Sequence, residues 1–211
     1  AAFYANFDYS FDTRYVFSAT VRYDGSNALG RNASARWLPT YNFGGKWNIM
    51  NEPFLKEKAR WIDQLSLRAS YGLTATMPPS ANAAAIFKNY NATRPSSSEI
   101  ESVIRLESLA NNELTWEKAY QTNVGADISL FKHRLNFIFD YWWRDSFDLI
   151  SSITTAGIGG QMTKRANYAD MESHGYDITV SGVPVRTKDF SWNSNFTFGF
   201  STNKITNAKH V

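Results

Sequence analysis

Polar and aromatic side chains suited to binding a ligand recur at alternate positions of the segment 116–144. Trp142 and Arg144 lie two residues apart, and an aromatic face beside a hydrogen-bonding cation suits the ring of a sugar. Asn123 and Asp140 add further hydrogen-bonding groups at positions of the same alternating pattern. We therefore predict that Asn123, Asp140, Trp142 and Arg144 face a substrate.

Signals for metal, nucleotide or covalent chemistry are weak. His133, His174 and His210 lie far apart and lack His-x-x-His spacing, which predicts no metal site. The Gly-rich stretch 157–160 lacks the strand and helix that flank a nucleotide-binding loop, and residues 24–27 fit a turn better than a calcium loop. Cysteine is absent, and no Ser/His/Asp arrangement stands out. We expect no catalytic residues, no cofactor and no enzymatic activity.

Alternating apolar and polar residues dominate the elements that would carry these side chains. Period-2 alternation predicts β-strands with one apolar and one polar face. The clearest example is a pair of long strands joined by a short reversal at 131–133. Together the pattern predicts eight strands, over residues 3–10, 15–23, 36–47, 64–71, 116–130, 134–144, 173–182 and 190–201.

The predicted connections alternate in length along the chain. Reversals at 11–14, 131–133 and 183–188 are short, whereas 24–34, 74–113 and 145–170 are long. A short helix is predicted after Asn51-Glu52-Pro53, over about 54–60, because Pro is favoured in the first helical turn. Residues 100–109 could form a short helix or a strand, and Pro39 predicts a bulge or local irregularity in its strand.

Short turns on one side and long loops on the other are typical of outer-membrane β-barrels. Tryptophans near the predicted strand ends fit the aromatic girdles of such barrels; they are Trp37, Trp47, Trp116, Trp143 and Trp192. If the short turns are periplasmic, both chain ends lie on the outer side. A self-contained bacterial barrel is expected to begin and end at the periplasm. Chain ends on the outer side therefore predict an arc of a larger barrel.

Composition is compatible with this interpretation. The 211 residues are 43% hydrophobic and 16% aromatic, and no run of about 18 apolar residues predicts a transmembrane helix. A net charge of +3 without basic clusters gives no reason to expect a nucleic-acid partner. Residues 1–11 show no signal-peptide features, so the protein is either cytosolic or begins upstream of residue 1.

Five segments occur in the order and spacing of one family: 22–30 (RYDGSNALG), 37–49 (WLPTYNFGGKWNI), 65–74 (LSLRASYGLT), 107–150 and 167–205. The last two contain WEK, NVGADISLFKHRL and MESHGYD. With these motifs the chain resembles the barrel domain of SusC/RagA-type TonB-dependent outer-membrane transporters over nearly its whole length.

This resemblance implies an all-β fold, an antiparallel transmembrane β-barrel of about 22 strands with long extracellular loops and a plugged lumen. Residues 1–211 would be a partial barrel domain, an arc of about eight strands, without the plug domain or TonB box. It also implies the outer membrane of a Gram-negative cell and import of oligosaccharides or peptides. The implied partners are a SusD-like surface lipoprotein, the TonB complex acting through the plug, and the lipid bilayer.

Two other functions remain open on the residues alone: a passive porin, and a secreted soluble all-β adhesive or binding protein. A soluble protein would stay monodisperse without detergent, and a porin would lack a plug domain upstream. Within the importer interpretation, loops 74–113 and 145–170 are expected to contact substrate.

Overall fold

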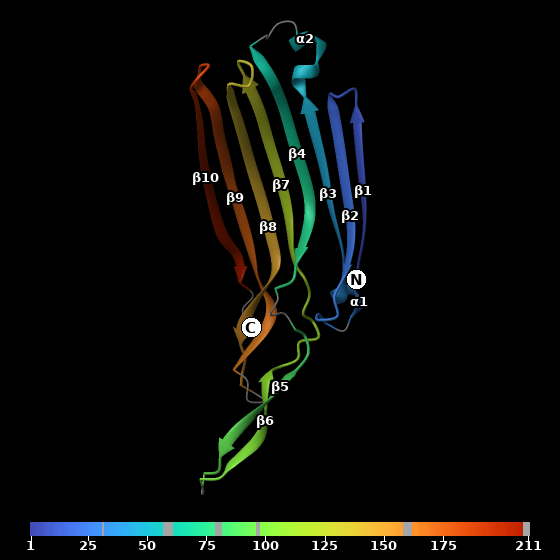
Figure 1. Cartoon of the computed structure of the whole chain (residues 1–211). Coiled ribbons are helices and arrows are strands. Elements are labelled where there is room, and N and C mark those ends of the chain that lie inside the picture. Colours follow the sequence, from blue (N-terminus) through green and yellow to red (C-terminus); the bar gives the residue numbers. More distant parts are fainter. Residues whose placement is uncertain (31, 57–60, 79–81, 96–97, 158–161, 209–211) are drawn as a thin grey trace.

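The computed structural model describes residues 1–30, 32–56, 61–78, 82–95, 98–157 and 162–208. Eight strands form one antiparallel sheet in the order β1-β2-β3-β4-β7-β8-β9-β10, and β5 pairs with β6 in a separate ribbon (Figure 1). The sheet strands are β1 (Ala2–Phe11), β2 (Tyr15–Gly25), β3 (Trp37–Asn48), β4 (Ile62–Thr76), β7 (Glu117–Leu130), β8 (Leu135–Thr154), β9 (Thr163–Arg186) and β10 (Ser191–Ala208).

These are the eight strands that the alternation predicts. The sheet is open, with β1 and β10 at its two edges. The expected helical link is present as a 3-10 turn, η1 (Ile49–Asn51), and a short helix, α2 (Pro53–Lys56), which begins one residue before the predicted start. Residues 57–60 of the expected helix lie outside the described residues. A second short helix, α1 (Ala33–Arg36), precedes β3.

Two sequence-based expectations need correction, and one open alternative is decided. Residues 145–170 are not mainly a loop, because β8 and β9 pair from Leu135 as far as Thr154 opposite Thr163, past a bulge at Phe147–Asp148. The long connection 74–113 contains a hairpin of β5 (Ile86–Thr93) and β6 (Ile100–Ser108), so its apolar stretch is a strand. Pro39 causes no bulge, since the pairing of β2 with β3 continues unbroken through it.

The short turns use backbone conformations that non-glycine residues rarely adopt. Phe131, Lys132 and His133 have φ of 56°, 59° and 58°, a left-handed conformation that costs about 1–2 kcal/mol per residue. Neighbouring groups hold the turn: the His133 N–H donates to Asp63 Oδ2 at 2.9 Å, and Ser129 Oγ lies 2.7 Å from His133 Nδ1. His133 is therefore a turn residue.

The sheet is a single layer with two different faces. In the part of the chain that the structure describes, no second layer covers either face. Cross-strand pairing places one row of apolar side chains across the whole sheet: Phe11, Tyr15, Trp47, Leu67, Ala126, Phe139, Ile178 and Phe198. We call this side the apolar face. The other side, the polar face, carries the row Lys46, Arg68, Gly125, Asp140 and Asp177.

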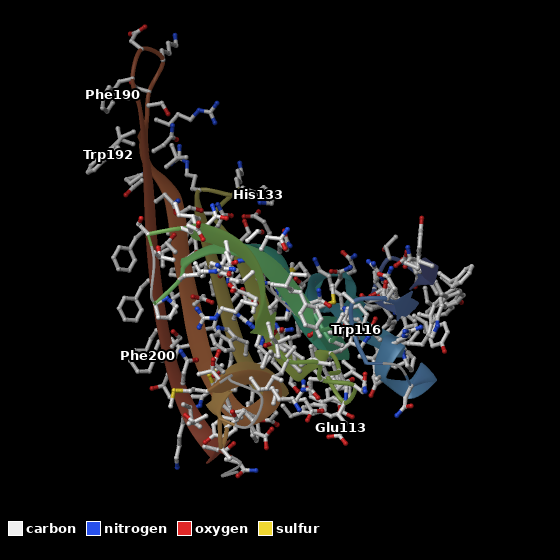
Figure 2. All side chains as sticks on the ribbon, turned by 90° about the horizontal axis from the view of Figure 1, so that it is seen from below. Glu113, Trp116, His133, Phe190, Trp192 and Phe200 are labelled. Carbon is white, nitrogen blue, oxygen red and sulfur yellow. The ribbon has the colours of Figure 1, made fainter. Side chains whose placement is uncertain are left out.

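Side chains of the apolar face are exposed in the chain by itself. Phe7 is 57% exposed and Phe196 is 61% exposed. Figure 2 shows Trp192 and Phe200 of β10, and Phe190 just before it, projecting away from the other strands. Soluble monomers rarely expose apolar patches beyond a few hundred Å². The apolar face therefore requires a non-aqueous environment.

At the long-loop end of the sheet, three connections pack on one another. Leu29, Ala83 and Leu114 are buried together, and backbone bonds join Gly30 N–H to Leu114 at 2.9 Å and Ala83 N–H to Ala28 at 2.8 Å. The β5–β6 hairpin extends beyond this small core, away from the sheet (Figure 1). Both described ends of the chain, in β1 and β10, lie toward this end of the sheet.

At the opposite, short-turn end, a buried carboxylate joins three segments. Glu52 is 7% exposed. Its Oε1 accepts the Tyr15 hydroxyl at 2.7 Å and the Trp47 indole N–H at 3.1 Å, and its Oε2 accepts Arg14 Nη1 at 3.3 Å. The hydrogen bonds from Tyr15 and then Trp47 hold the pKa of Glu52 below its usual value, against the opposing effect of burial.

Glu52→Gln should lower Tm at pH 7.5, because the ionised carboxylate binds all three donors. The folded-state pKa of Glu52 lies below that of the unfolded chain, so its stabilisation is present above about pH 4.5 and is lost as pH falls through the lowered pKa. Thermal unfolding of the detergent-solubilised protein at pH 7.5 and pH 3 measures this. The Tm difference between variant and wild type should shrink at pH 3; an equal difference at both pH values would contradict it.

Candidate functional site on the polar face

The structure brings the four predicted substrate-facing residues together on the polar face. Asn123 of β7 lies opposite Trp142 of β8, Asp140 lies opposite Gly125, and Arg144 lies opposite Gln121. They thus occupy three successive rows of two neighbouring strands. The structure describes no ligand, so their contact with a substrate remains a prediction.

Trp142 and Arg144 lie in the middle of β8 and not near its end, because β8 continues to Thr154. Along β8, however, they lie beside the point where the apolar residues of the opposite face give way to charged ones. On the apolar face of the same strand, the Trp143 indole N–H donates to Asp145 at 3.0 Å. Asp145 begins a charged row with Glu172 and Lys204. Trp143 was expected in an aromatic girdle near a strand end. It lies instead within β8, where the apolar residues end and the charged row begins.

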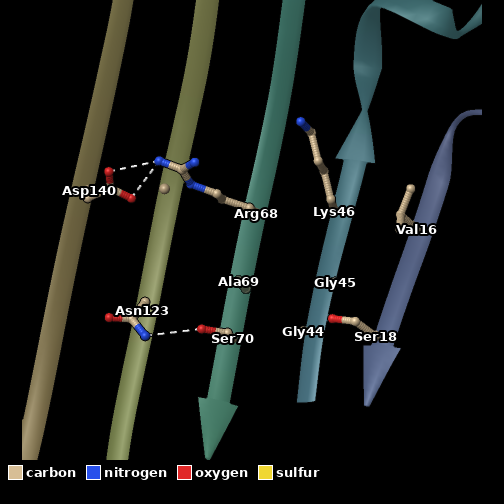
Figure 3. Close-up of a pocket in the computed structure, with 11 residues that line it drawn as sticks. Val16, Ser18, Gly44, Gly45, Lys46, Arg68, Ala69, Ser70, Asn123 and Asp140 are labelled. Atoms are coloured by element: carbon tan, nitrogen blue, oxygen red, sulfur yellow. Dashed lines mark hydrogen bonds and ion pairs between the residues drawn. The ribbon is translucent and has the colours of Figure 1, made fainter. Parts of the chain in front are cut away.

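Four charged side chains brace the polar face toward its short-turn end. Arg68 Nη2 lies 2.8 Å from both carboxylate oxygens of Asp140 (Figure 3). Arg68 Nη1 lies 3.3 Å from Asp127. Lys46 Nζ lies 3.8 Å from the same Asp127, which also accepts the Ser66 hydroxyl at 3.1 Å. Two cations and two anions therefore neutralise one another across β3, β4, β7 and β8.

Gly125 lets this brace form. Arg68 on β4 reaches Asp140 on β8 by crossing the intervening strand β7 at Gly125 (Figure 3). A Cβ at Gly125 would lie 2.5 Å from Arg68 Nε and in still closer contact with Asp140 Oδ1. A cavity of about 240 Å³ beside the crossing is lined by Lys46, Ser70 and Asn123 among others.

A second chain of hydrogen bonds lies next to the brace, on the side of the long loops. Arg144 donates from Nε and Nη2 to Gln121 Oε1 at 3.2 and 2.8 Å. Gln121 donates to Asn123 at 3.0 Å, and Asn123 donates to Ser70 at 3.1 Å. Sequence reasoning did not single out Gln121, which joins two of the predicted residues. Its position in the sequence could have identified it, because Gln121 lies on the polar side of the alternating pattern, two residues before Asn123.

Trp142 lies against a glycine on the next strand. A Cβ at Gly175 of β9 would lie 2.8 Å from Trp142 Cζ2 and 2.9 Å from Cε2. The indole therefore rests on the backbone of β9, and its ring is half-buried. This leaves an aromatic surface beside Arg144 on the polar face.

The residues weighed for metal or nucleotide chemistry do not assemble. His174 lies opposite Trp143, far from the turn that holds His133, and His210 lies outside the described residues. Among the residues that the structure covers, no group of three His, Asp or Glu could hold a metal ion. Asp24 pairs with Arg22 at 2.7 Å. Gly157 has φ 75°, and residues 158–160 of the Gly-rich stretch are not described.

Comparison with known proteins decides the family. A family model described as "TonB dependent receptor-like, beta-barrel" matches residues 1–210. The chain belongs to this family of TonB-dependent receptor barrels. Its open eight-stranded sheet is accordingly an arc of a larger barrel.

Relatives of this receptor-barrel chain are much longer. It is 30% identical to TonB-dependent receptor P39 of Formosa agariphila over 97% of this chain and 19% of that protein. It is 27% identical to TonB-dependent receptor SusC of Bacteroides thetaiotaomicron over 97% of this chain and 20% of that protein. The chain thus spans about a fifth of the length of the curated relatives it matches.

The fold of this receptor-barrel chain matches solved importers. The RagAB peptide importer in its "closed-closed" state matches with a TM-score of 0.85 and 26% identity, covering 99% of this chain and 22% of that chain. The same importer in its "open-open" state matches with a TM-score of 0.80. Among the described residues of the present structure, helices are too short or too polar to cross a membrane.

Gly125→Ala should destabilise the sheet by about 1–3 kcal/mol, because the added methyl overpacks the point where Arg68 crosses β7. Gly45→Ala is the matched control, since a Cβ there meets nothing within 4 Å. Denaturant titration of the complete receptor in detergent micelles measures both. Equal unfolding free energies for the two variants would contradict the conclusion that Arg68 crosses β7 in the space left by Gly125.

Proposed function

We propose that this chain forms part of the barrel wall of a TonB-dependent importer in the outer membrane of a Gram-negative bacterium. The main support is a single-layer sheet with one apolar face and one polar face whose charges are paired across four strands. The chain also matches importer barrels along nearly its whole length. The imported nutrient is an oligosaccharide or a peptide. A peptide is supported by RagAB, a peptide importer of the same fold.

In this proposal the apolar face contacts lipid and the polar face lines the lumen. Aromatic residues with a polar tip mark both edges of the apolar band, as expected at bilayer interfaces. Tyr15 and Trp47 stack 6.3 Å apart and donate to Glu52 at the short-turn edge, while Trp143 donates to Asp145 at the other. The short turns are then periplasmic and the β5–β6 hairpin extracellular.

One lysine on the apolar face supports this placement. Lys118 lies at the long-loop end of β7, where it pairs with Asp148 at 3.0 Å and lies 5.6 Å from the Phe147 ring centroid. A lysine on the lipid face costs about 2–4 kcal/mol at the bilayer midplane and about 0–1 near the interface. Its position fits the interface.

The plug domain and TonB box of such an importer would belong to the rest of a complete receptor, of which residues 1–211 supply wall strands. Of the four predicted substrate-facing residues, Trp142 and Arg144 are proposed to contact substrate directly. Asp140 has both oxygens on Arg68, and Asn123 is held between Gln121 and Ser70. Asp140 and Asn123 are therefore proposed to hold β7 and β8 in place beside Trp142 and Arg144.

TonB dependence separates this proposal from a passive porin. Uptake of labelled peptides and oligosaccharides by cells that express the complete receptor should require an intact TonB complex. Uptake that continues unchanged after TonB is removed would favour a porin. A receptor that stays monodisperse without detergent would instead favour a soluble all-β protein; the comparisons support neither alternative.

A SusD-like surface lipoprotein is the proposed partner, and the hairpin supports it. One face of the β5–β6 ribbon is internally paired: Lys88 and the Tyr90 hydroxyl bind Glu107 at 2.9 and 2.7 Å. On the other face Phe87 and Ile104 are 63% and 74% exposed. An isolated two-stranded ribbon is marginally stable in water, so a protein surface covering this face would stabilise it.

Deleting residues 86–108, with a short flexible linker in their place, should abolish uptake while the barrel still inserts. The deletion leaves the core of Leu29, Ala83 and Leu114 intact. Heat-modifiable migration reports insertion, and co-purification reports partner binding. Ile104→Asp should weaken partner binding by about tenfold or more, whereas Arg105→Gln on the paired face should not. Normal uptake by the deletion variant would contradict the role of the hairpin.

A further inference from the structure

A hollow of about 360 Å³ lies at the long-loop end of the polar face, beyond the braced charges. It is formed by β4, β7, β8 and β9, and its lining includes Thr76, Glu117, Gln121, Arg144, Ser146 and Met171. Its charged lining residues are Glu117, Arg144 and Lys118, of which Lys118 belongs to the apolar face and pairs with Asp148.

Glu117 and Arg144 are held in place but do not neutralise each other. Arg144 is fixed by two hydrogen bonds to Gln121 Oε1, at 3.2 and 2.8 Å. Glu117 Oε1 accepts the backbone N–H of Ile150 at 2.8 Å. Within the described residues, neither side chain forms an ion pair. Arg144 Nη1 and Glu117 Oε2 are left without a protein partner there.

Several other charges of this face are paired, although Asp8 and Asp177 also form no ion pair within the described residues. Lys46, Arg68, Asp127 and Asp140 pair with one another, and Arg22 pairs with Asp24. Neighbouring Lys118 is engaged by Asp148. A fixed cation and a fixed anion that both lack an ionic partner are complementary to a ligand that carries one charge of each sign.

Building on the proposed function, we propose that this hollow binds a zwitterionic substrate, an oligopeptide with a free amino and a free carboxyl terminus. Arg144 receives the carboxylate, since guanidinium groups bind carboxylates with directed, charge-assisted hydrogen bonds. Glu117 receives the ammonium group. A neutral oligosaccharide would desolvate both charges without pairing them, which is unfavourable.

The strand geometry sets the ligand length. Arg144 lies opposite Gln121, which is four residues from Glu117, so their backbone positions are about 13 Å apart at about 3.3 Å per residue. An extended peptide spans at most about 3.3–3.6 Å per residue. A peptide of about four residues therefore matches the separation, and side-chain reach extends the range to about three to five.

Blocked peptides test the proposal without altering the protein. Calorimetric titration of the complete receptor with its partner would use tetra-alanine with free termini, its N-acetylated and C-amidated forms, and a neutral tetrasaccharide. Blocking either terminus should weaken binding about tenfold or more, a change of about 1.4 kcal/mol. Equal affinity for free and doubly blocked tetra-alanine, or tighter binding of the tetrasaccharide, would overturn the proposal.

Two substitutions assign the ends of the ligand. Arg144→Gln should remove the preference for a free carboxylate while keeping that for a free amine, and Glu117→Gln should do the reverse. Arg22→Gln is the matched control, a cation on the same face whose partner is Asp24. The assignment would be overturned if Arg22→Gln lost the preferences for a free carboxylate and a free amine as strongly as the two site variants do.

TonB-dependent uptake separates this inference from the proposed function. If wild-type receptor shows no terminus preference but imports another nutrient in a TonB-dependent way, the inference fails and the importer function stands. If uptake is independent of TonB, the importer function itself fails.

Discussion

The continuous antiparallel ladder is the constraint on which the rest of the structure depends. Because the ladder is a single layer, backbone hydrogen bonding satisfies the strands internally while each face must find its own environment. A slip of one residue would exchange the faces of a strand. In β4, for example, such a slip would turn Leu67 to the polar side, and the pairing of Arg68 with Asp140 would be lost.

Two groups of charges on the polar face have different consequences. The group around Arg68 is neutralised internally and joins four strands, so it stiffens the wall and offers little free charge to a ligand. Arg144 and Glu117, nearer the long-loop end, are oriented by neutral partners and keep their charge available. Gly125 gives Arg68 a place to cross β7, and Gly175 gives the Trp142 ring a place to rest on β9.

The two ends of the sheet are built for different tasks. At the short-turn end, Glu52 and the left-handed turn at 131–133 fasten neighbouring strands with little projecting structure. At the other end, the packed connections around Leu114 carry a hairpin with an uncovered apolar face. A periplasmic rim that stays closed and an extracellular rim that meets a partner would require this asymmetry.

The sequence alone determined the eight sheet strands, their faces and the side on which long connections gather, because alternation and turn residues are local signals. The motif run was specific enough to indicate the receptor family. Only the tertiary structure showed that β8 and β9 extend past a bulge, since mixed polar residues there carry no clear period. Only the tertiary structure showed that Asp140 is held by Arg68, 72 residues away, whereas Arg144 and Glu117 form no ion pair with any described residue. Those outcomes depend on strand register and on the space left at Gly125, which no local pattern encodes.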